Sequence, residues 1–486
     1  IERDLISTQF SGEHYLPYLK DSRINWRFYL NNSKKIEPDY RRIIYARDIG
    51  DNGPFAAVLG FQANLKNGGR FFSNLNDKSR GLSLDFKTKF YSAKVKIGFS
   101  YEYAKRDFAS RLISVIINAS GNGLTDFSLL YLPPDRIFNP ENFRRNGFSI
   151  GEYVNGTNNY SASEKIFASY VMTDLPLNIF DREFSLISGL RLENASQTIN
   201  SMDNSGLVPI YNQNKNLDLL PSLNLLYKFN ENTNLRVSYS QTLNRPELRE
   251  LAPFAYFDFA TQTSLKGNPD LKRSFIRNFD LRIENFPAPG KLISASVFYK
   301  NISNAIEKVV VTGSALGSER TFINSDKAEI YGFEIEGRIS FGFIYEYLEN
   351  LSINGNYTRI KSLVNVKGTE TTIPRENRPL QGQSPYVINL GLFFIEPTIM
   401  TSLTLTYNKI GERIVEVATA YQDDVIEKPR DILDFKLTQY LFRGLSLNFS
   451  IKDILAKDVQ FVQENLPARI IKTNSTYSLG LNYKLN

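Results

Sequence analysis

The sequence predicts an all-β fold, a transmembrane antiparallel β-barrel whose domain occupies residues 1–486. Two observations predict this fold. Apolar and polar residues alternate along many segments, and the connections between these segments are short and long in turn. Alternation with a period of two gives a strand one apolar and one polar face, which suits a wall between lipid and an aqueous lumen.

The alternation is clearest at the end of the chain, where one face of the expected strand carries only Tyr and Leu. These residues are Tyr477, Leu479, Leu481, Tyr483 and Leu485. The same pattern recurs at residues 223–229, 235–240, 293–300, 403–407 and 445–452. An apolar face repeated on so many strands exceeds what one soluble core needs, so we expect it to contact lipid.

The connections between the expected strands differ strongly in length. Short turns are predicted at residues 20–22, 230–232, 287–290, 396–398 and 443–444. Long polar segments are predicted at about residues 34–79, 108–160, 198–217, 244–274, 304–330, 363–383, 413–429 and 456–473. Short periplasmic turns and long extracellular loops are typical of outer-membrane barrels. Within the longest segment, residues 139–143 predict a short helix, with Asn as N-cap and Pro at its first position.

We count about 17 strands, each near the length that a tilted membrane strand needs. The first, at about residues 5–17, precedes a short turn, and the last strand of a barrel ends in the periplasm, so both run downwards. In an even-stranded barrel whose first strand runs upwards, the downward strands are even-numbered. Seventeen strands that begin with an even-numbered one fit strands 6–22 of a 22-stranded barrel, the class with a plugged lumen. The closing strand then pairs with a first strand outside this sequence, so we expect its outer edge to be unpaired.

Composition excludes several classes of protein. The chain has no Cys, so disulfides, thiolate metal sites and cysteine nucleophiles are excluded. The net charge of +7 is spread along the chain without a Lys/Arg block, which argues against a nucleic-acid partner. No run of 18 apolar residues is present, so the sequence predicts no membrane-spanning helix.

The sequence predicts no catalytic residue, metal site or cofactor. One histidine, His14, cannot supply a His-based zinc site, and we expect it to be a lumen-facing or interface residue. Residues 147–151 match a nucleophile elbow by chance, because no His follows them. Four carboxylates have the oxygen chemistry that calcium needs, but no EF-type loop is present and we interpret them as solvated. They are Asp258, Asp270, Asp423 and Asp424.

Several segments, spread over most of the chain, together resemble the barrel of TonB-dependent receptors of the Bacteroidetes type. The most specific is residues 240–259, which begins Ser-Gln-Thr-Leu-Asn-Arg-Pro-Glu-Leu. The others are residues 160–170 with 189–193, 267–272, 325–336 and 378–386. Ser478, Gly480, Tyr483 and Leu485 also resemble the C-terminal β-signal of outer-membrane barrels, although the usual terminal aromatic residue is absent.

The resemblance implies a transporter of the bacterial cell outer membrane and not an enzyme. It implies surroundings of outer-membrane lipid, an N-terminal plug and a Ton box pulled by TonB, and it allows for a lipoprotein lid partner. We expect the plug, the Ton box and a signal peptide upstream of residue 1. The expected function is import of a scarce or large nutrient of the siderophore, glycan, peptide or cobalamin class. Two alternatives stay open: a passive porin, and a scaffold or accessory subunit of an outer-membrane complex.

One extracellular loop carries the candidate ligand-binding residues. They are Arg245, Arg249, Phe254, Tyr256, Phe257 and Phe259. Aromatic rings stack on a sugar or a chelate, and guanidinium groups bind anions. The alternative is that the segment is a structural element that folds into the barrel mouth with its charges paired among themselves. We expect four more cations to face the lumen: Arg236, Lys300, Lys452 and Lys484. They either make a basic lumen that attracts anions or belong to an ordinary solvated wall.

Overall fold

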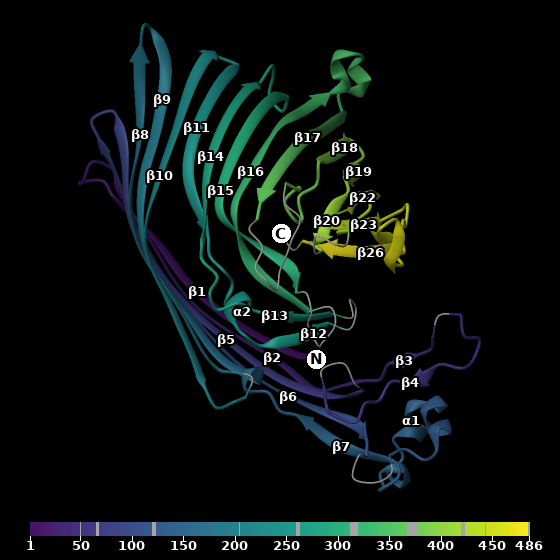
Figure 1. Ribbon diagram of the computed structural model, residues 1–486. Coiled ribbons are helices and arrows are strands. Elements are labelled where there is room, and N and C mark those ends of the chain that lie inside the picture. Colours follow the sequence, from purple (N-terminus) through teal and green to yellow (C-terminus); the bar gives the residue numbers. More distant parts are fainter. Residues whose placement is uncertain are drawn as a thin grey trace.

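The computed structural model is built around one large, strongly curved and mainly antiparallel sheet, accompanied by two small sheets (Figure 1). It describes residues 1–48, 50–64, 68–118, 123–203, 205–258, 263–311, 319–366, 377–418, 423–442 and 444–484. Three of the sheet's twenty strands, β7, β12 and β13, are accessory, and the other seventeen form a meander in chain order. The prediction of about 17 strands is therefore confirmed.

The meander pairs each long strand with the next long strand in sequence. Its members are β1 (Glu2–Leu16), β2 (Ser22–Arg42), β5 (Gly69–Phe90), β6 (Ala93–Ile117), β8 (Asn159–Ile179), β9 (Arg182–Met202), β10 (Pro209–Asn230), β11 (Thr233–Asn244), β14 (Ser274–Asn285), β15 (Leu292–Val311), β16 (Glu319–Ser340), β17 (Leu351–Asn365), β18 (Tyr386–Glu396), β19 (Thr401–Ile410), β22 (Arg430–Phe442), β23 (Leu445–Lys452) and β26 (Thr476–Tyr483).

The remaining elements lie mostly in the long connections. They are β3 (Tyr45–Ala46), β4 (Ala56–Ala57), β7 (Phe148–Tyr153), β12 (Ala255–Asp258), β13 (Thr263–Lys266), β20 (Arg413–Glu416), β21 (Val425–Glu427), β24 (Val459–Gln463), β25 (Leu466–Ile471), α1 (Pro134–Ile137), α2 (Leu248–Leu251) and the 3-10 turns η1 (Phe127–Tyr131), η2 (Pro140–Asn142), η3 (Gly156–Asn158), η4 (Phe341–Phe343) and η5 (Glu346–Leu348). In the part of the chain that the structure describes, no helix has the length and apolarity to cross a membrane.

The short helix predicted at residues 139–143 is present as the 3-10 turn η2. The Asn139 Oδ1 atom accepts a hydrogen bond from the backbone N–H of Glu141 at 3.2 Å. Pro140 occupies the first position of the turn, where a backbone N–H would have no acceptor within the turn, so proline loses no hydrogen bond. The cap and the proline therefore act as expected, and the turn ends after three residues.

The register of the sheet aligns the apolar residues on its outer face. Phe28 lies opposite Leu82, and Leu82 lies opposite Tyr101. At the other end of the sheet, Phe449 lies opposite Leu479. Leu82 is 44% exposed and Leu479 is 73% exposed, as expected for side chains that contact lipid rather than a protein core.

The unpaired edge of the closing strand is also confirmed within the described residues. There β26 pairs only with β23, and β1 pairs only with β2, so the sheet is an open wall. Leu485, expected on the same face as Tyr483, lies outside the described residues. That a complete barrel has 22 strands stays a prediction.

Several strands extend further than the sequence predicted. The connection expected at residues 198–217 contains only residues 203–208, because β9 and β10 pair as far as Met202 and Pro209. The backbone ladder continues beyond the apolar band, where the outer face meets water. On the inner face of β9, small, polar and apolar residues are buried together, namely Ala195, Gln197 and Ile199. Alternation disappears there although the strand does not, so sequence periodicity missed these strand ends.

The inner face is charged but largely paired. Arg236 bonds to Glu284 at 2.9 Å, and Arg282 bonds to Glu284 and Glu336 at 2.9 and 2.7 Å. Lys300, one of the expected lumen cations, donates to the Asn278 Oδ1 atom at 2.8 Å. Of the predicted lumen cations, Arg236 is thus neutralised by a carboxylate, whereas Lys300 keeps its charge.

His14 lies on the outer face, not in the lumen. His14 lies opposite Ile24, and Gly12, two residues earlier on the same face of β1, lies opposite Trp26. The indole Nε1–H of Trp26 donates to the His14 Nε2 atom at 3.0 Å. The lumen-facing option is thus wrong, and the side chain belongs to the outer surface.

Candidate functional site

The connection between β11 and β14, residues 245–273, folds into the concave side of the sheet. It carries α2, β12 and β13, which Figure 1 shows inside the curve. Strand β12 pairs antiparallel with β13, and β13 pairs parallel with the start of β16 through Ser264 and Leu265. We call residues 245–258 and 263–273 the inner loop. On the concave face it contacts the wall from β5 and β6 to β16.

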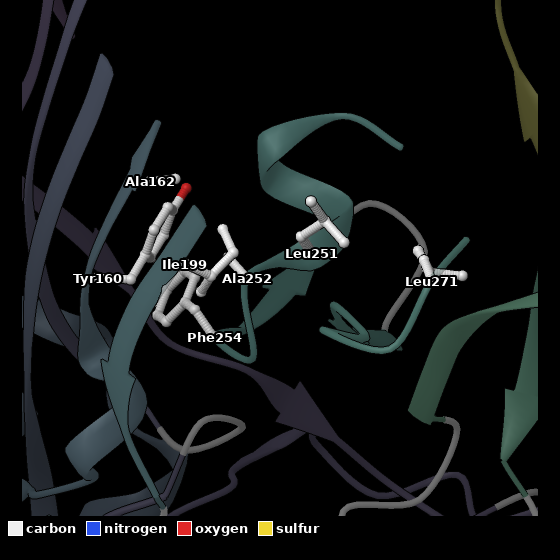
Figure 2. Packing of buried hydrophobic residues seen from close by; sticks show 7 residues of the cluster. All are labelled: Tyr160, Ala162, Ile199, Leu251, Ala252, Phe254 and Leu271. Carbon is white, nitrogen blue, oxygen red and sulfur yellow. The ribbon is translucent and has the colours of Figure 1, made fainter. Parts of the chain in front are cut away.

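An apolar seam joins the inner loop to the wall. Figure 2 shows Ala252 and Phe254 beside Ile199 and Tyr160, which come from β9 and β8. The ring of Phe254 lies 4.7 Å from that of Phe108 on β6, centroid to centroid. Phe254 is 3% exposed, so its area is removed from water on one side by the wall and on the other by the loop itself.

Polar contacts hold the two ends of the inner loop. Arg245 forms an ion pair with Glu193 of β9, and both side chains are mostly buried. At the far end, Arg273 bonds to Asp218 of β10 at 2.6 Å. Between them, the Asn268 amide donates to the carbonyl oxygen of Phe322 on β16 at 2.9 Å. The two ends of the loop are therefore attached to the neighbouring strands β9 and β10, and its middle is attached to β16.

Local sequence shapes the inner loop between these attachments. Glu247 and Glu250 form a capping box, in which the Glu250 carboxylate accepts from the Glu247 backbone N–H at 2.9 Å. Gly267 lies so close to this turn that an added Cβ atom would be 2.1 Å from the carbonyl oxygen of Ala252. The turn signal at residues 267–270 thus also permits a close approach that only glycine allows.

Arg249 is the most unusual cation of the inner loop. Its Nη2–H donates to the carbonyl oxygen of Leu265 at 3.1 Å, and its guanidinium lies 5.2 Å from the centroid of the Phe254 ring. Burial lowers the pKa of Arg249 below its ordinary value. Among the described residues it has no carboxylate partner, unlike Arg245. A partly desolvated cation without a counter-charge attracts an anion.

A cavity of about 220 Å³ lies between the inner loop and the wall. Arg249, Phe254 and Tyr256 line it from the loop. The wall contributes Lys35, Glu37, Phe71, Ser73, Leu75, Arg106, Phe108 and Tyr160. The cavity thus combines aromatic rings with cations, as a site for an anionic or planar ligand needs.

Most charges around this cavity are already paired. Lys35 bonds to Glu37 at 3.0 Å, and Arg106 forms two bonds of 2.7 Å to Asp77. These two pairs cancel their own charge. The remaining positive charge is that of Arg249, so the guanidinium of this residue dominates the electrostatics of the cavity.

The structure brings the predicted loop residues together but uses them differently. Arg245 is an anchor, and Phe254 and Phe257 pack against the wall, with Phe257 4% exposed beside Leu112. Tyr256 is 40% exposed and Arg249 faces the cavity. Phe259 lies outside the described residues. The alternative of charges paired within the loop does not hold for the two arginines: Arg245 pairs with Glu193 of the wall, and Arg249 has no carboxylate partner among the residues described.

Sequence reasoning missed the residues of the wall. Lys35, Arg106, Phe108 and Tyr160 come from three strands far from the loop in the chain. One signal was present: Phe108 and Tyr160 are large aromatic residues on the inner face, where most side chains are polar. That signal marks a packing site without saying which segment packs there.

No other feature of the described residues forms a reactive site. They contain no cluster of three or more His, Cys, Asp or Glu residues that could hold a metal ion. The motif at residues 147–151 lies largely in strand β7, without the strand–turn–helix context of a nucleophile elbow.

Comparison with solved structures supports the fold. The chain is similar to the ferric-catecholate import receptor Fiu from E. coli K12 in its closed form, with 15% identity and a TM-score of 0.62, covering 99% of this chain and 64% of Fiu. The siderophore receptor PiuA from Acinetobacter baumannii shows 11% identity and a TM-score of 0.63, with 99% and 64% covered. The unliganded ferric citrate transporter FecA shows 12% identity and a TM-score of 0.61, with 99% and 61% covered.

The chain spans less than two thirds of the length of each of these proteins. No curated protein matches the sequence. A family model described as "TonB dependent receptor-like, beta-barrel" matches residues 5–466. That match covers nearly the whole wall, from β1 to the start of β25. An outer-membrane location follows from it, and the lipid-facing band agrees. The chain belongs to the family of TonB-dependent receptor-like β-barrels.

Proposed function

We propose that this protein imports a scarce or large nutrient across the outer membrane as a TonB-dependent transporter. The observation that supports this most strongly is the inner loop, which lies across the mouth of the lumen and presents Arg249 and Tyr256 to a cavity. A ligand held there has entered the mouth but not crossed the barrel. Such a geometry suits capture followed by a separate, gated passage step.

We propose that the ligand is anionic, within the siderophore, glycan, peptide and cobalamin classes. Arg249 supplies positive charge without a carboxylate partner among the described residues, and Tyr256 offers an accessible ring. The names of the similar structures include ferric catecholate and ferric citrate as ligands of those proteins. An anionic metal chelate therefore fits best, because it satisfies both the charge and the aromatic surface.

We further propose that a plug and a Ton box lie upstream in the complete protein and that TonB supplies the force for transport. A lipoprotein lid on the extracellular side is part of the same proposal. The proposal assigns no catalytic step, and therefore no catalytic residue. The sequence upstream of Ile1 is the direct check: a chain that starts there without a plug would contradict energy-coupled transport.

A passive porin is the first alternative, and the inner loop argues against it. A loop attached to β9, β10 and β16 narrows the mouth, whereas a porin keeps an open aqueous path. The second alternative is a scaffold subunit of an outer-membrane complex. Uptake that continues unchanged after gene deletion, together with stoichiometric partners on purification, would favour the scaffold.

Replacing Arg249 by Gln is expected to weaken uptake at least about tenfold, because a charged hydrogen bond to the ligand is lost. The measurement is energised uptake of radiolabelled ferric citrate and a ferric catecholate chelate by cells that express the complete gene. Arg145→Gln is the control for the loss of one positive charge, since Arg145 is an exposed arginine of another long connection. Arg249→Lys keeps the charge and should retain part of the uptake.

Arg249 also hydrogen-bonds within the inner loop, so the folding of the loop in the Arg249→Gln variant must be checked separately. Protease resistance of the inner loop in the purified variant shows whether the loop remains attached. Normal uptake of both chelates in Arg249→Gln, with the loop attached, would contradict the assigned role. Failure of both chelates to enter wild-type cells would instead redirect the search to the other nutrient classes.

A further inference from the structure

The outer face of the wall changes from apolar to basic between two neighbouring rows of side chains. On the membrane side, Phe28 lies opposite Leu82, and Phe167 stands in the same row beyond Tyr101. Two residues further along each strand, Leu30 lies opposite Arg80, Arg80 opposite Tyr103, and Tyr103 opposite Lys165. The transition takes place over one pleat repeat of the sheet, about 7 Å.

The basic side continues into the next row outwards. There, Lys78 lies opposite Lys105 in the register of β5 and β6. We call Lys78, Arg80, Lys105 and Lys165 the basic collar. Lys105 bonds to Asp107 at 2.9 Å, whereas the other three form no ion pair among the described residues. Four cations with one carboxylate partner leave this surface strongly positive.

Tyr103 organises the centre of the collar. The guanidinium of Arg80 lies 5.1 Å from its ring centroid on one side, and the ammonium of Lys165 lies 5.8 Å from it on the other. Both cations are therefore held by the same ring, without being neutralised by it. An anion placed beside Tyr103 can therefore interact with both cations.

A hollow of about 460 Å³ lies beside this pair on the same face. Lys78, Arg80 and Tyr103 line its basic side, and Ile6 and Leu30 line its apolar side. Ile6 is 66% exposed and Leu30 is 43% exposed, so neither is used in packing. The hollow thus offers cations and apolar surface to one amphipathic ligand.

We propose that the basic collar binds the phosphate groups of an anionic glycolipid in the outer leaflet. The collar lies at the edge of the lipid-facing band, on the side of the long extracellular connections, which is the depth of lipid headgroups. Cations at this position attract anionic headgroups, by about 1 kcal/mol for each Lys or Arg. The acyl chains then lie along Leu30, Leu82 and Phe167, so charge and apolar surface match a single lipid molecule.

Neutralising two collar cations, in the variant Arg80→Gln/Lys165→Gln, is expected to weaken lipid binding about 30-fold. The measurement is native mass spectrometry of the full protein in detergent, titrated with a bisphosphorylated, acylated glycolipid. The same lipid without its phosphates should bind wild type as weakly as the phosphorylated lipid binds the variant. High salt should reduce the difference, because the contact is electrostatic and exposed.

The matched control is Lys20→Gln/Lys291→Gln. Both lysines also lie over aromatic rings, at 5.6 Å from Phe90 and 5.9 Å from Phe343, but they belong to short turns at the opposite end of the wall. Their removal should leave lipid affinity unchanged. Three results would overturn the proposal: unchanged affinity in the collar variant, equal binding of the dephosphorylated lipid, or displacement of the lipid by millimolar inorganic phosphate.

Loss of folding would be recognised independently. The collar variant should retain the heat-modifiable gel mobility and β-sheet circular dichroism of wild type, because all replaced side chains are on the surface. It should also retain chelate uptake in cells. If chelate uptake and lipid binding fall together, the collar acts through the fold of the wall and not through a lipid contact.

Discussion

Replacing Arg378 by Ala is expected to destabilise the protein by about 3–5 kcal/mol, the cost of leaving a buried charge without its partner. Arg378 precedes β18 in the chain and forms two bonds, of 3.0 and 2.8 Å, to the carboxylate of Glu307 on β15. The side chains are 5% and 1% exposed. The free energy of unfolding in guanidinium, measured in lipid vesicles, gives the size of the effect.

Two comparisons separate this cause from a general loss of charge. Arg413→Ala breaks the pair with Glu427, whose side chains are 36% and 23% exposed, and should cost less than about 1 kcal/mol. The double replacement of Glu307 and Arg378 by Leu should recover much of the stability, because no buried charge remains. A double variant as unstable as Arg378→Ala would show that packing, not the charge, is responsible.

Phe254→Ala is expected to release the inner loop, with a loss of about 3–5 kcal/mol in the free energy of its local opening. The ring is 3% exposed and touches Phe108 and Tyr160, so the replacement leaves a cavity at the seam. Hydrogen exchange of the amides in α2 and β12 reports this opening directly. Exchange in the strands of the wall should stay slow.

Tyr256→Ala is the matched control for the seam. Tyr256 is two residues away in the same loop but 40% exposed, so its removal should change protection by less than about 1 kcal/mol. Its effect should instead appear in ligand binding, since it lines the cavity. Equal loss of protection in both variants would contradict the assignment of Phe254 as the residue that holds the loop.

The outer face of the wall was predictable because it depends on a period of two in the residues themselves. Tyr477, Leu479 and Leu481 could be placed on one face before any coordinates, and the register with β23 confirms it. The ends of β9 and β10 were not predictable in this way. Beyond the lipid the outer face of β9 meets water, whereas its inner face is buried at both Gln197 and Ile199. Polar and apolar residues thus share one face, so alternation is lost although the backbone still pairs as far as Met202.

The candidate site was predictable only in part. Arg249, Phe254 and Tyr256 could be selected as a cluster because they are close in sequence, but not whether the loop faces outwards or into the mouth. That choice depends on an apolar seam with Phe108 and Tyr160, two aromatic residues of the inner wall. The sequence of the loop alone does not show that it packs against Phe108 and Tyr160.

The sequence by itself determined the approximate number of long strands, the side on which the long connections lie and the lipid-facing side of strands with clear alternation, such as β23 and β26. These follow from turn chemistry and from alternation, which are local properties of the chain. Only the tertiary structure decided that Arg249 lies beside Lys35 and Arg106 and that Arg80 and Lys165 share the ring of Tyr103. Those neighbours depend on strand register and on the curvature of the sheet, which arise when distant segments pair.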